Sequence, residues 1–294
     1  MRIILVLILS CLSWCACAQT YHGTTVHTWC GDIPLSMYLP DDYFTSLHYY
    51  PVLYLLHGTG ENELSWFKSG NAEEIFDQLI GNGSMRKMIV VMPYSSGLTD
   101  GSYEDSFKEL MSYVEKNFRT YRGKRYHAIA GLSLGGFYAM HISHRYYNRF
   151  DYVGIFSAIY TTDKKSIFKR EPDALFGVTQ TSPLIYKNVE RDLEKQFKLS
   201  PKLYFIAIGK RDFLYNQNVL YRNFLEQNDY PYVYHETAGG HDWKNWQAYL
   251  MTFLPLLFND LPDEINATYE ELENNVETEH EVYFDISNLE KNIQ

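Results

Sequence analysis

Short apolar runs alternate along the chain with longer segments in which hydrophobic residues recur at helical spacing. Most of the short runs are apolar at consecutive positions, which is typical of strands buried on both faces of a parallel sheet. The pattern predicts an α/β fold with a mostly parallel central sheet and helices on both faces. We expect strands at Ser36–Leu39, Val52–Leu56, Met88–Met92, His127–Ala130, Tyr152–Phe156, Leu203–Ile208 and Tyr232–Glu236, and helices at Asp105–Tyr121, Gly136–Tyr147, Asn216–Gln227 and Trp243–Leu257.

Two segments depart from this alternation. Residues Tyr160–Ser200 are polar and mixed, lie between two predicted strands and are long for a connector, so they form either a helical, substrate-facing insertion or surface padding. Beyond Asn259 the chain has few aromatic residues and many acids, which indicates an appendage. We therefore predict a folded domain over residues 19–258 and an acidic tail over 259–294.

The beginning of the chain has the form of a secretory signal peptide over residues 1–18. Arg2 is followed by the apolar run Ile3–Leu9, and a small-x-small pattern ending at Ala18 precedes Gln19. This predicts export to the periplasm or the exterior, with no stable membrane insertion, because the run is too short to span a bilayer. The alternative is a lipoprotein, lipidated at Cys11, Cys15 or Cys17.

Composition and charge exclude several classes of protein. A content of 46% hydrophobic residues in 294 supports a sizeable core. The formal net charge of −10 lies in the tail, where eleven acids after Asn259 face one base, Lys291. The remaining body is balanced and has no basic surplus for nucleic acid or for an anionic membrane. The aromatic content of 16% fits sugar-binding surfaces and ordinary cores equally well.

Cysteine and histidine positions argue against a disulfide framework and a metal site. Cys30 is the one cysteine after the predicted signal peptide, so no internal disulfide can form in the exported chain, and its role stays open. His141 and His144 are three apart in a predicted helix without a carboxylate pattern beside them, which favours packing over metal binding. We predict neither a metal nor a cofactor.

The motif Gly131-Leu132-Ser133-Leu134-Gly135 carries the candidate chemistry. It follows a predicted strand and opens a predicted helix. A strand that turns abruptly into a helix strains the central residue and requires small neighbours, and this turn lifts a serine hydroxyl to the edge of the sheet. Ser133 is therefore the candidate nucleophile, next to a helix N-terminus that favours an adjacent oxyanion.

A serine hydroxyl needs a base within hydrogen-bond reach, and the base needs an orienting acid. In strand-turn-helix hydrolases the acid and then the base follow the nucleophile along the chain. Asp212 lies just after the strand predicted at Leu203–Ile208, and His241 lies in the loop after the last predicted strand. We predict Asp212 as the acid and His241 as the base. The reserve acids are Asp163 and Asp173.

Stabilising an oxyanion takes two backbone N–H groups. One is expected from Leu134, the residue after the nucleophile. The other is expected from the loop after Val52–Leu56, where glycines allow close approach, with Thr59 favoured and Gly58 next. His57 is expected to hold that loop.

These motifs resemble the esterase D-like esterase family of α/β-hydrolases, which includes the feruloyl and acetylxylan esterases of carbohydrate esterase family one. The resemblance spans roughly Val26 to Phe258. It implies an α/β-hydrolase fold and cofactor-free serine esterase chemistry. In such a fold the polar segment Tyr160–Ser200 is an insertion before the strand that precedes the acid. The matching stretches are Leu55-Leu56-His57-Gly58-Thr59-Gly60-Glu61 with Trp66, Ala130-Gly131-Leu132-Ser133-Leu134-Gly135-Gly136, Gly209-Lys210-Arg211-Asp212-Phe213, and Gly239-Gly240-His241-Asp242-Trp243 with Trp246.

The chain also departs from this family. Glu61 and Asn62 stand where a further glycine is common, and Ser157-Ala158 stand where Ser-Gly is common. These departures concern loop detail and substrate preference. Trp66 and Trp243 are expected either to line the acyl or sugar side of the site or to pack the loops.

The expected activity is hydrolysis of feruloyl or acetyl decorations on plant polysaccharide or oligosaccharide. A broad carboxylesterase, an acyltransferase and a siderophore-ester hydrolase are alternatives on the same fold. An alternative of another class is a carbohydrate-binding protein on a catalytically dead scaffold. The sequence leaves the acyl group, the alcohol and the oligomeric state open.

Overall fold

The computed structural model describes residues 21–95, 102–158 and 189–261. The predicted signal peptide, residues 160–188 of the polar segment, the tail beyond Leu261 and the reserve acids Asp163 and Asp173 lie outside the described residues. Leu261 is buried, and Asp260 contacts Lys202 and the Tyr152 hydroxyl, so these first residues past the predicted domain end pack on its body.

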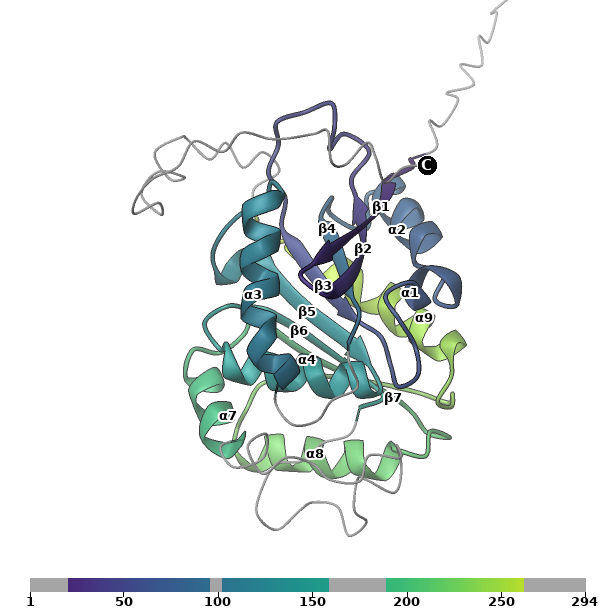
Figure 1. Cartoon of the computed structure of the whole chain (residues 1–294). Helices are drawn as coiled ribbons and strands as arrows, with labels where there is room; N and C mark the ends of the chain where they lie inside the picture. Colours follow the sequence, from purple (N-terminus) through teal and green to yellow (C-terminus); the bar gives the residue numbers. More distant parts are fainter. Residues whose placement is uncertain (1–20, 96–101, 159–188, 262–294) are drawn as a thin grey trace, which may run out of the picture.

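An eight-stranded sheet in the order β1-β2-β4-β3-β5-β6-β7-β8 forms the centre of the described protein (Figure 1). The pairs β1–β2 and β2–β4 are antiparallel, and the pairs from β4 through β8 are parallel. This confirms the predicted α/β-hydrolase class of fold. The strands are β1 (Thr24–Cys30), β2 (Ile33–Leu39), β3 (Val52–Leu56), β4 (Ile89–Pro93), β5 (His127–Leu132), β6 (Tyr152–Phe156), β7 (Leu203–Gly209) and β8 (Val233–Thr237).

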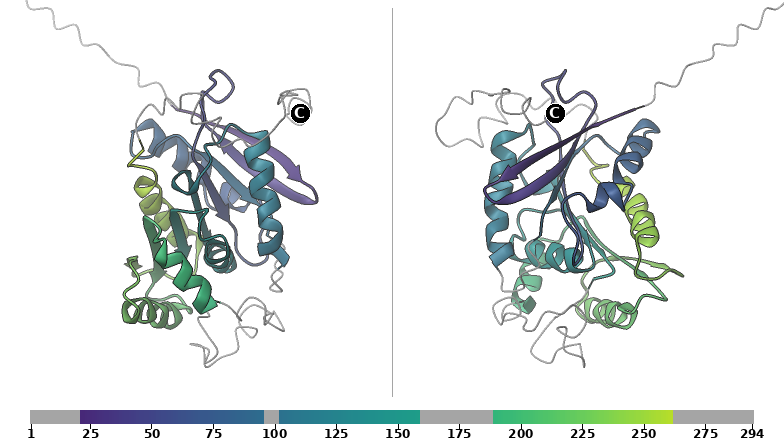
Figure 2. Two further views of the ribbon diagram at one scale, coloured as in Figure 1. Left: turned by 90° about the vertical axis from the view of Figure 1, so that its left-hand side faces the viewer. Right: turned by 45° about the vertical axis from the view of Figure 1, so that its right-hand side comes forward.

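Helices cover both faces of the sheet, as the views in Figure 2 show. Buried side chains of α3, α4, α7 and α8 form one core, and those of α1, α2 and α9 form the other. The helices are α1 (Ser65–Lys68), α2 (Ala72–Gly81), α3 (Ser102–Asn117), α4 (Leu134–Arg145), α7 (Val189–Lys198), α8 (Tyr215–Gln227) and α9 (Trp243–Phe253), with 3-10 turns at Lys124–Tyr126 and Leu254–Leu256.

The alternation of side chains along each strand separates the two cores. In β3, Val52, Tyr54 and Leu56 belong to the core under α3 and α4, whereas Leu53 and Leu55 belong to the core under α2 and α9. Successive side chains of a strand point to opposite faces, so a central strand must be apolar at every position. All five residues of β3 are fully buried, which explains its continuous apolar run.

The strand order indicates where a site is expected. The chain passes from β3 outward to β4 and then returns to β5, which pairs with the other side of β3. In open parallel sheets, ligands bind outside the carboxyl ends of the strands at such a reversal of direction. The loop after β3 and the turn after β5 meet at this reversal, and both contain predicted site residues.

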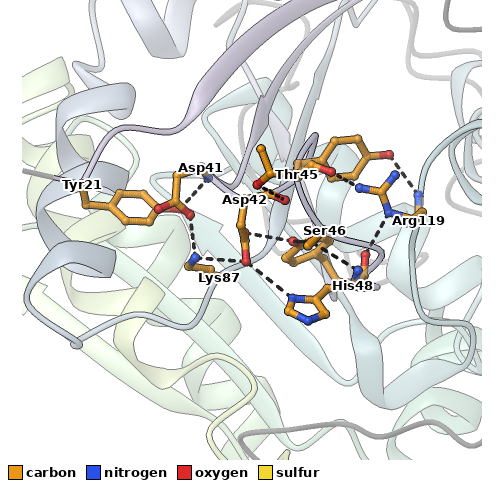
Figure 3. A network of polar contacts seen from close by, with 10 residues as sticks. Tyr21, Asp41, Asp42, Thr45, Ser46, His48, Lys87 and Arg119 are labelled. Atoms are coloured by element: carbon orange, nitrogen blue, oxygen red, sulfur yellow. Dashed lines mark hydrogen bonds and ion pairs between the residues drawn. The ribbon is translucent and has the colours of Figure 1, made fainter.

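Polar contacts secure the opposite, amino end of β3 (Figure 3). Lys87 forms ion pairs with Asp41 and Asp42, and the Tyr50 hydroxyl donates a hydrogen bond to Asp42. The Arg119 guanidinium donates to the carbonyl oxygens of Tyr43 and His48. These contacts fix the loop before β3 and join it to the chain that follows α3, without involving the predicted site residues.

Within the described part of the chain, none of the helices combines the length and apolar character needed to cross a membrane.

Candidate active site

Ser133 occupies a strained turn between β5 and α4. Its φ of 53° and ψ of −117° are unusual for a residue with a side chain. The turn needs small neighbours: a Cβ on Gly131 would lie 2.3 Å from the Gly135 carbonyl oxygen, and one on Gly135 would lie 2.3 Å from that of His57. The Ser133 amide donates to the Phe156 carbonyl oxygen at 2.8 Å, which fixes the turn against β6.

The structure brings Ser133, His241 and Asp212 together from three separate loops. The Nε2 atom of His241 lies 3.0 Å from the Ser133 hydroxyl oxygen, and its Nδ1 atom lies 2.9 Å from Oδ2 of Asp212. Asp212 follows β7 and is 4% exposed, and its Oδ1 accepts a hydrogen bond from the Leu214 amide at 2.8 Å. Both carboxylate oxygens therefore have partners, and the acid is held in one orientation.

These contacts fix the tautomer of His241. A carboxylate only accepts hydrogen bonds, so Nδ1 must carry the hydrogen that faces Asp212. In the neutral ring Nε2 is then an acceptor, and the Ser133 hydroxyl donates to it. A hydroxyl hydrogen-bonded to a basic nitrogen is arranged for general-base activation of the oxygen.

The His241 loop is positioned by close backbone packing. A Cβ on Gly209 would lie 2.2 Å from the Gly239 carbonyl oxygen, and that same oxygen accepts from the Arg211 amide at 2.9 Å. The Asn245 side-chain amide donates to the Gly240 carbonyl oxygen at 3.0 Å. The acid loop and the base loop therefore touch directly, which sets the distance between Asp212 and His241.

The backbone amides that are candidates for the oxyanion hole differ in the hydrogen-bond partners they already have. Leu134 is the first residue of α4, where a backbone N–H has no partner within the helix and the helix dipole favours negative charge. The Gly58 amide donates to Oε2 of Glu61 at 2.8 Å. The Gly58 amide is therefore already engaged, and Thr59 as the second oxyanion donor stays a prediction.

His57 holds the loop after β3 in place. The ring nitrogen Nδ1 lies 2.8 Å from the Gly58 carbonyl oxygen, and Nε2 accepts from the Ser95 amide at 2.9 Å. An acceptor at Nε2 requires the neutral ring, and burial lowers the pKa of His57 accordingly. The loop after β3 is thus tied to the chain that follows β4.

Trp66 does not lie where a substrate contact requires it. Its side chain is 1% exposed, and the indole N–H donates to the Leu56 carbonyl oxygen at 3.1 Å. It packs edge-to-face on Trp243, with ring centroids 5.2 Å apart. Trp66 therefore packs against β3 and Trp243, which is the second of its two expected roles, and its burial argues against contact with a substrate. Trp243 itself is partly exposed.

Two residues beside the site had no assigned role in the sequence analysis. Phe213 is 56% exposed, and its ring centroid lies 4.5 Å from that of His241. Glu61 is partly buried, and its Oε2 accepts a hydrogen bond from the Gly58 amide. The sequence signal for Phe213 is its place as an aromatic residue directly after the acid. The position of Glu61 depends on how the loop folds back, which local sequence does not reveal.

His141 and His144 are buried in α4, away from the solvent. Burial lowers the pKa of His141 to about 3 and that of His144 well below its ordinary value, so both rings are neutral. Across residues 21–95, 102–158 and 189–261, the structure has no group of three or more side chains suited to a metal ion.

Comparison with known proteins adds to this geometry. A family model described as "Putative esterase" matches residues 27–257. An endo-1,4-beta-xylanase/feruloyl esterase of Xylanibacter ruminicola is 42% identical over 121 residues, covering 37% of this chain and 16% of that protein. An acetyl esterase of Caldicellulosiruptor saccharolyticus is 29% identical over 225 residues, covering 67% of this chain and 79% of that protein.

Solved structures agree with the sequence relatives. The structure of a ferulic acid esterase superposes with a TM-score of 0.69 at 25% identity, covering 81% of this chain and 98% of that one. The chain spans between 16% and 27% of the length of the first curated relatives it matches. The shared region is therefore one part of those longer proteins.

Proposed function

The chain belongs to the esterase family, as its motifs indicated, and from this premise we propose that it is an exported serine esterase that hydrolyses carboxylic esters. The observation that carries the proposal is the continuous path of hydrogen bonds from Asp212 through His241 to Ser133. Such a path is what a serine hydroxyl needs to become a nucleophile near neutral pH.

The proposed reaction has two acyl-transfer steps. The Ser133 oxygen attacks the ester carbonyl while Nε2 of His241 takes its proton, and Asp212 stabilises the resulting imidazolium. The amides of Leu134 and Thr59 donate to the developing oxyanion, and a single such donor is worth about 3 kcal/mol of barrier. The imidazolium then protonates the departing alcohol. Water, deprotonated by His241, releases the acid from Ser133.

Replacement of the nucleophile tests this proposal. Ser133→Ala is expected to abolish turnover of 4-nitrophenyl butyrate while leaving the circular dichroism spectrum and the thermal unfolding transition unchanged. An alkyl phosphonate probe is expected to label the wild-type chain at Ser133, located by peptide mass spectrometry. Turnover retained by Ser133→Ala would refute the proposal, and failure of the probe to label Ser133 would favour a catalytically dead scaffold.

We further propose that the natural substrates are acyl decorations, feruloyl or acetyl, on plant polysaccharide or oligosaccharide. Support comes from two of the relatives, a xylanase/feruloyl esterase and an acetyl esterase. The exposed ring of Phe213 against His241 supports feruloyl esters as substrates, because flat aromatic groups stack on such rings. Initial rates on methyl ferulate, acetylated xylan and 4-nitrophenyl butyrate distinguish a preference for feruloyl esters from a preference for acetyl esters.

The same assay distinguishes a hydrolase from a transferase. Product analysis with an added sugar or alcohol acceptor is expected to give the free acid as the main product. Similar rates on all three esters would favour a broad carboxylesterase, and a dominant transfer product would favour an acyltransferase.

Export completes the proposal. The apolar run after Arg2 and the small-x-small pattern before Gln19 predict cleavage after Ala18. Mass spectrometry of the chain expressed with its leader is expected to find Gln19 at the mature N-terminus. An intact leader would contradict export by this route, and a lipidated cysteine would indicate the lipoprotein alternative.

A further inference from the structure

Glu61 places a carboxylate in the immediate surroundings of the nucleophile. A Cβ on Gly58 would lie 3.4 Å from Oε2 of Glu61 and 3.5 Å from the Cβ of Ser133, so the carboxylate and the serine side chain both lie beside the same glycine. The proposed reaction does not use this acid.

The contacts of Glu61 hold the carboxylate without cancelling its charge. Oε2 accepts from the Gly58 amide at 2.8 Å. Burial raises the pKa of the Glu61 carboxyl, and the neighbouring Gly58 amide and Trp243 side chain, both uncharged, oppose that rise. In the part of the chain that the structure describes, Glu61 has no salt bridge to a lysine or arginine. A fixed, uncompensated negative charge therefore stands beside the site.

We propose that Glu61 is a specificity-determining residue that makes the site discriminate against esters with an anionic group close to the scissile bond. The inference rests on the proposed function, because it concerns the substrates of that same site. Neutral acyl groups and sugar hydroxyls are accepted beside the carboxylate, whereas a substrate carboxylate is repelled. The proton on Ser133 and the attack itself do not involve Glu61.

Three other acids near the site differ from Glu61 in their surroundings. Both carboxylate oxygens of Asp212 have hydrogen-bond partners, His241 and the Leu214 amide, so its charge acts on the imidazole. Asp242 caps α9 by accepting from the Asn245 amide. Glu63 lies two residues further along the same loop, and its charge acts on His57. Glu63 therefore provides a matched control for the removal of one negative charge from the loop.

The test compares two esters that differ in one terminal group. Methyl valerate and monomethyl glutarate have acyl chains of equal length, which end in a methyl group and in a carboxylate. The values of kcat/KM are measured by methanol release at pH 7.5 and low ionic strength for the wild type and for Glu61→Gln, Glu61→Asp and Glu63→Gln. Gln keeps an oxygen for the Gly58 amide and removes the charge, and Asp keeps the charge.

Glu61→Gln is expected to raise the glutarate-to-valerate ratio of kcat/KM by about tenfold, the scale expected for two charges several Å apart at a partly buried site. Glu61→Asp and Glu63→Gln are expected to keep the wild-type ratio within about twofold, and salt is expected to weaken the wild-type discrimination. A loss of activity toward both esters without a change in ratio would indicate a structural role and overturn the proposal.

The outcomes also separate this inference from the proposed function. Turnover of methyl valerate by the wild type with an unchanged ratio in Glu61→Gln would overturn the role of Glu61 and leave the esterase intact. A wild-type chain that hydrolyses neither ester would overturn both.

Discussion

The orientation of the Asp212 carboxylate determines what His241 can do. Oδ1 faces the Leu214 amide, so only Oδ2 is available to the imidazole. The hydrogen on Nδ1 and the lone pair on Nε2 follow from that single contact, because the two nitrogens of a neutral imidazole have opposite roles. A change at Asp212 therefore acts on the tautomer of His241 as well as on charge.

Asp212→Asn is expected to lower kcat by about 10³–10⁴ with little change in KM. The oxygen of the new amide would stay with the Leu214 amide and its NH₂ group would face Nδ1, so the ring would carry its hydrogen on Nε2 and could not accept the serine proton. Steady-state kinetics on 4-nitrophenyl butyrate measure the effect. The matched control is Asp242→Asn, whose side chain caps α9, with activity expected within about twofold of wild type. Wild-type kcat in Asp212→Asn would contradict this account.

Phe213 allows a second prediction at this scale. Its ring lies against His241 and is more than half exposed, so it offers an apolar surface next to the reacting atoms. Phe213→Ala is expected to raise KM for methyl ferulate about fivefold to twentyfold, since ring contacts of this kind are worth ~1 kcal/mol or more. KM for 4-nitrophenyl acetate is expected to change little. Equal effects on both esters would argue against an aromatic acyl site at Phe213.

At the scale of elements, the contact between α4 and β3 is made of backbone. The Gly135 Cα faces the carbonyl oxygens of Leu56 and His57, which would lie 2.6 Å and 2.3 Å from an added Cβ. Backbone cannot yield as a flexible side chain can, so the helix would have to move away from the sheet. Ser133 and the first turn of α4 would move with it.

Gly135→Ala is therefore expected to lower the free energy of unfolding by about 1–3 kcal/mol, as overpacking does, and to lower kcat at the same time. Urea denaturation and ester kinetics measure the two effects. Gly81→Ala is the control, because its added Cβ would meet only the Tyr21 side chain, at 3.1 Å. Unchanged stability and unchanged kcat in Gly135→Ala would show that the helix does not depend on this close approach.

The buried strands could be predicted from the sequence because each is continuously apolar. β3 and β6 have the predicted ends, and the other predicted strands differ by a few residues. Gly131 was assigned to the turn, yet it pairs with Leu56 and Ile155 and belongs to β5. β1 was not predicted, since this edge strand buries Val26 and leaves its other residues partly or fully exposed. α1, α2 and α7 were not predicted as separate helices either.

Helix ends depended on contacts that are distant in sequence. The predicted helix over Asp105–Tyr121 ends at Asn117 in the structure. The residues that follow leave the helix because Thr120 forms a bridge with Tyr50, and the Tyr121 amide donates to the Tyr50 carbonyl oxygen. Nothing in the local hydrophobic pattern indicates a partner seventy residues earlier. By contrast, α2 has an apolar face at helical spacing, formed by Ile75, Phe76 and Leu79, so its own sequence indicates a helix.

The residues of the candidate site also differ in how well the sequence predicts their positions. Ser133, Asp212 and His241 come together as the strand order required, because each follows a strand whose carboxyl end lies at one edge of the sheet. The roles of side chains that depend on loop packing could not be read in advance. Trp66 is buried beneath the site, and Glu61 folds back to Gly58.

At the scale of the whole molecule, the sheet separates two cores, and buried histidines pack beside one of them. The core under α3 and α4 contains buried histidines of α4 next to its apolar residues, among them Phe137 and Tyr204. His141 is fully enclosed, and burial lowers its pKa to about 3. An uncharged histidine in a core is compatible with stability near neutral pH, but it makes the free energy of unfolding depend on pH in acid.

The sign of that coupling follows from proton uptake. Above pH 6.5 His141 is neutral in both the folded and the unfolded chain, so its full contribution to stability is present. Between pH 6.5 and about 3 the unfolded chain binds a proton that the folded chain does not. For one histidine, the free energy of unfolding therefore decreases by ~1.4 kcal/mol for each unit by which the pH is lowered. Stability is therefore lost on acidification, across that window.

His141→Gln is expected to reduce this slope by about 1 kcal/mol per pH unit between pH 6 and pH 4, even if it lowers stability at pH 7. Urea denaturation at a series of pH values gives the slope directly, and carboxylates that titrate in the same range contribute equally to both proteins. His27→Gln, at an exposed position, is the control and is expected to keep the wild-type slope. Identical slopes in His141→Gln and the wild type would mean that protons reach His141 in the folded chain, and that the core under α4 opens before the protein unfolds.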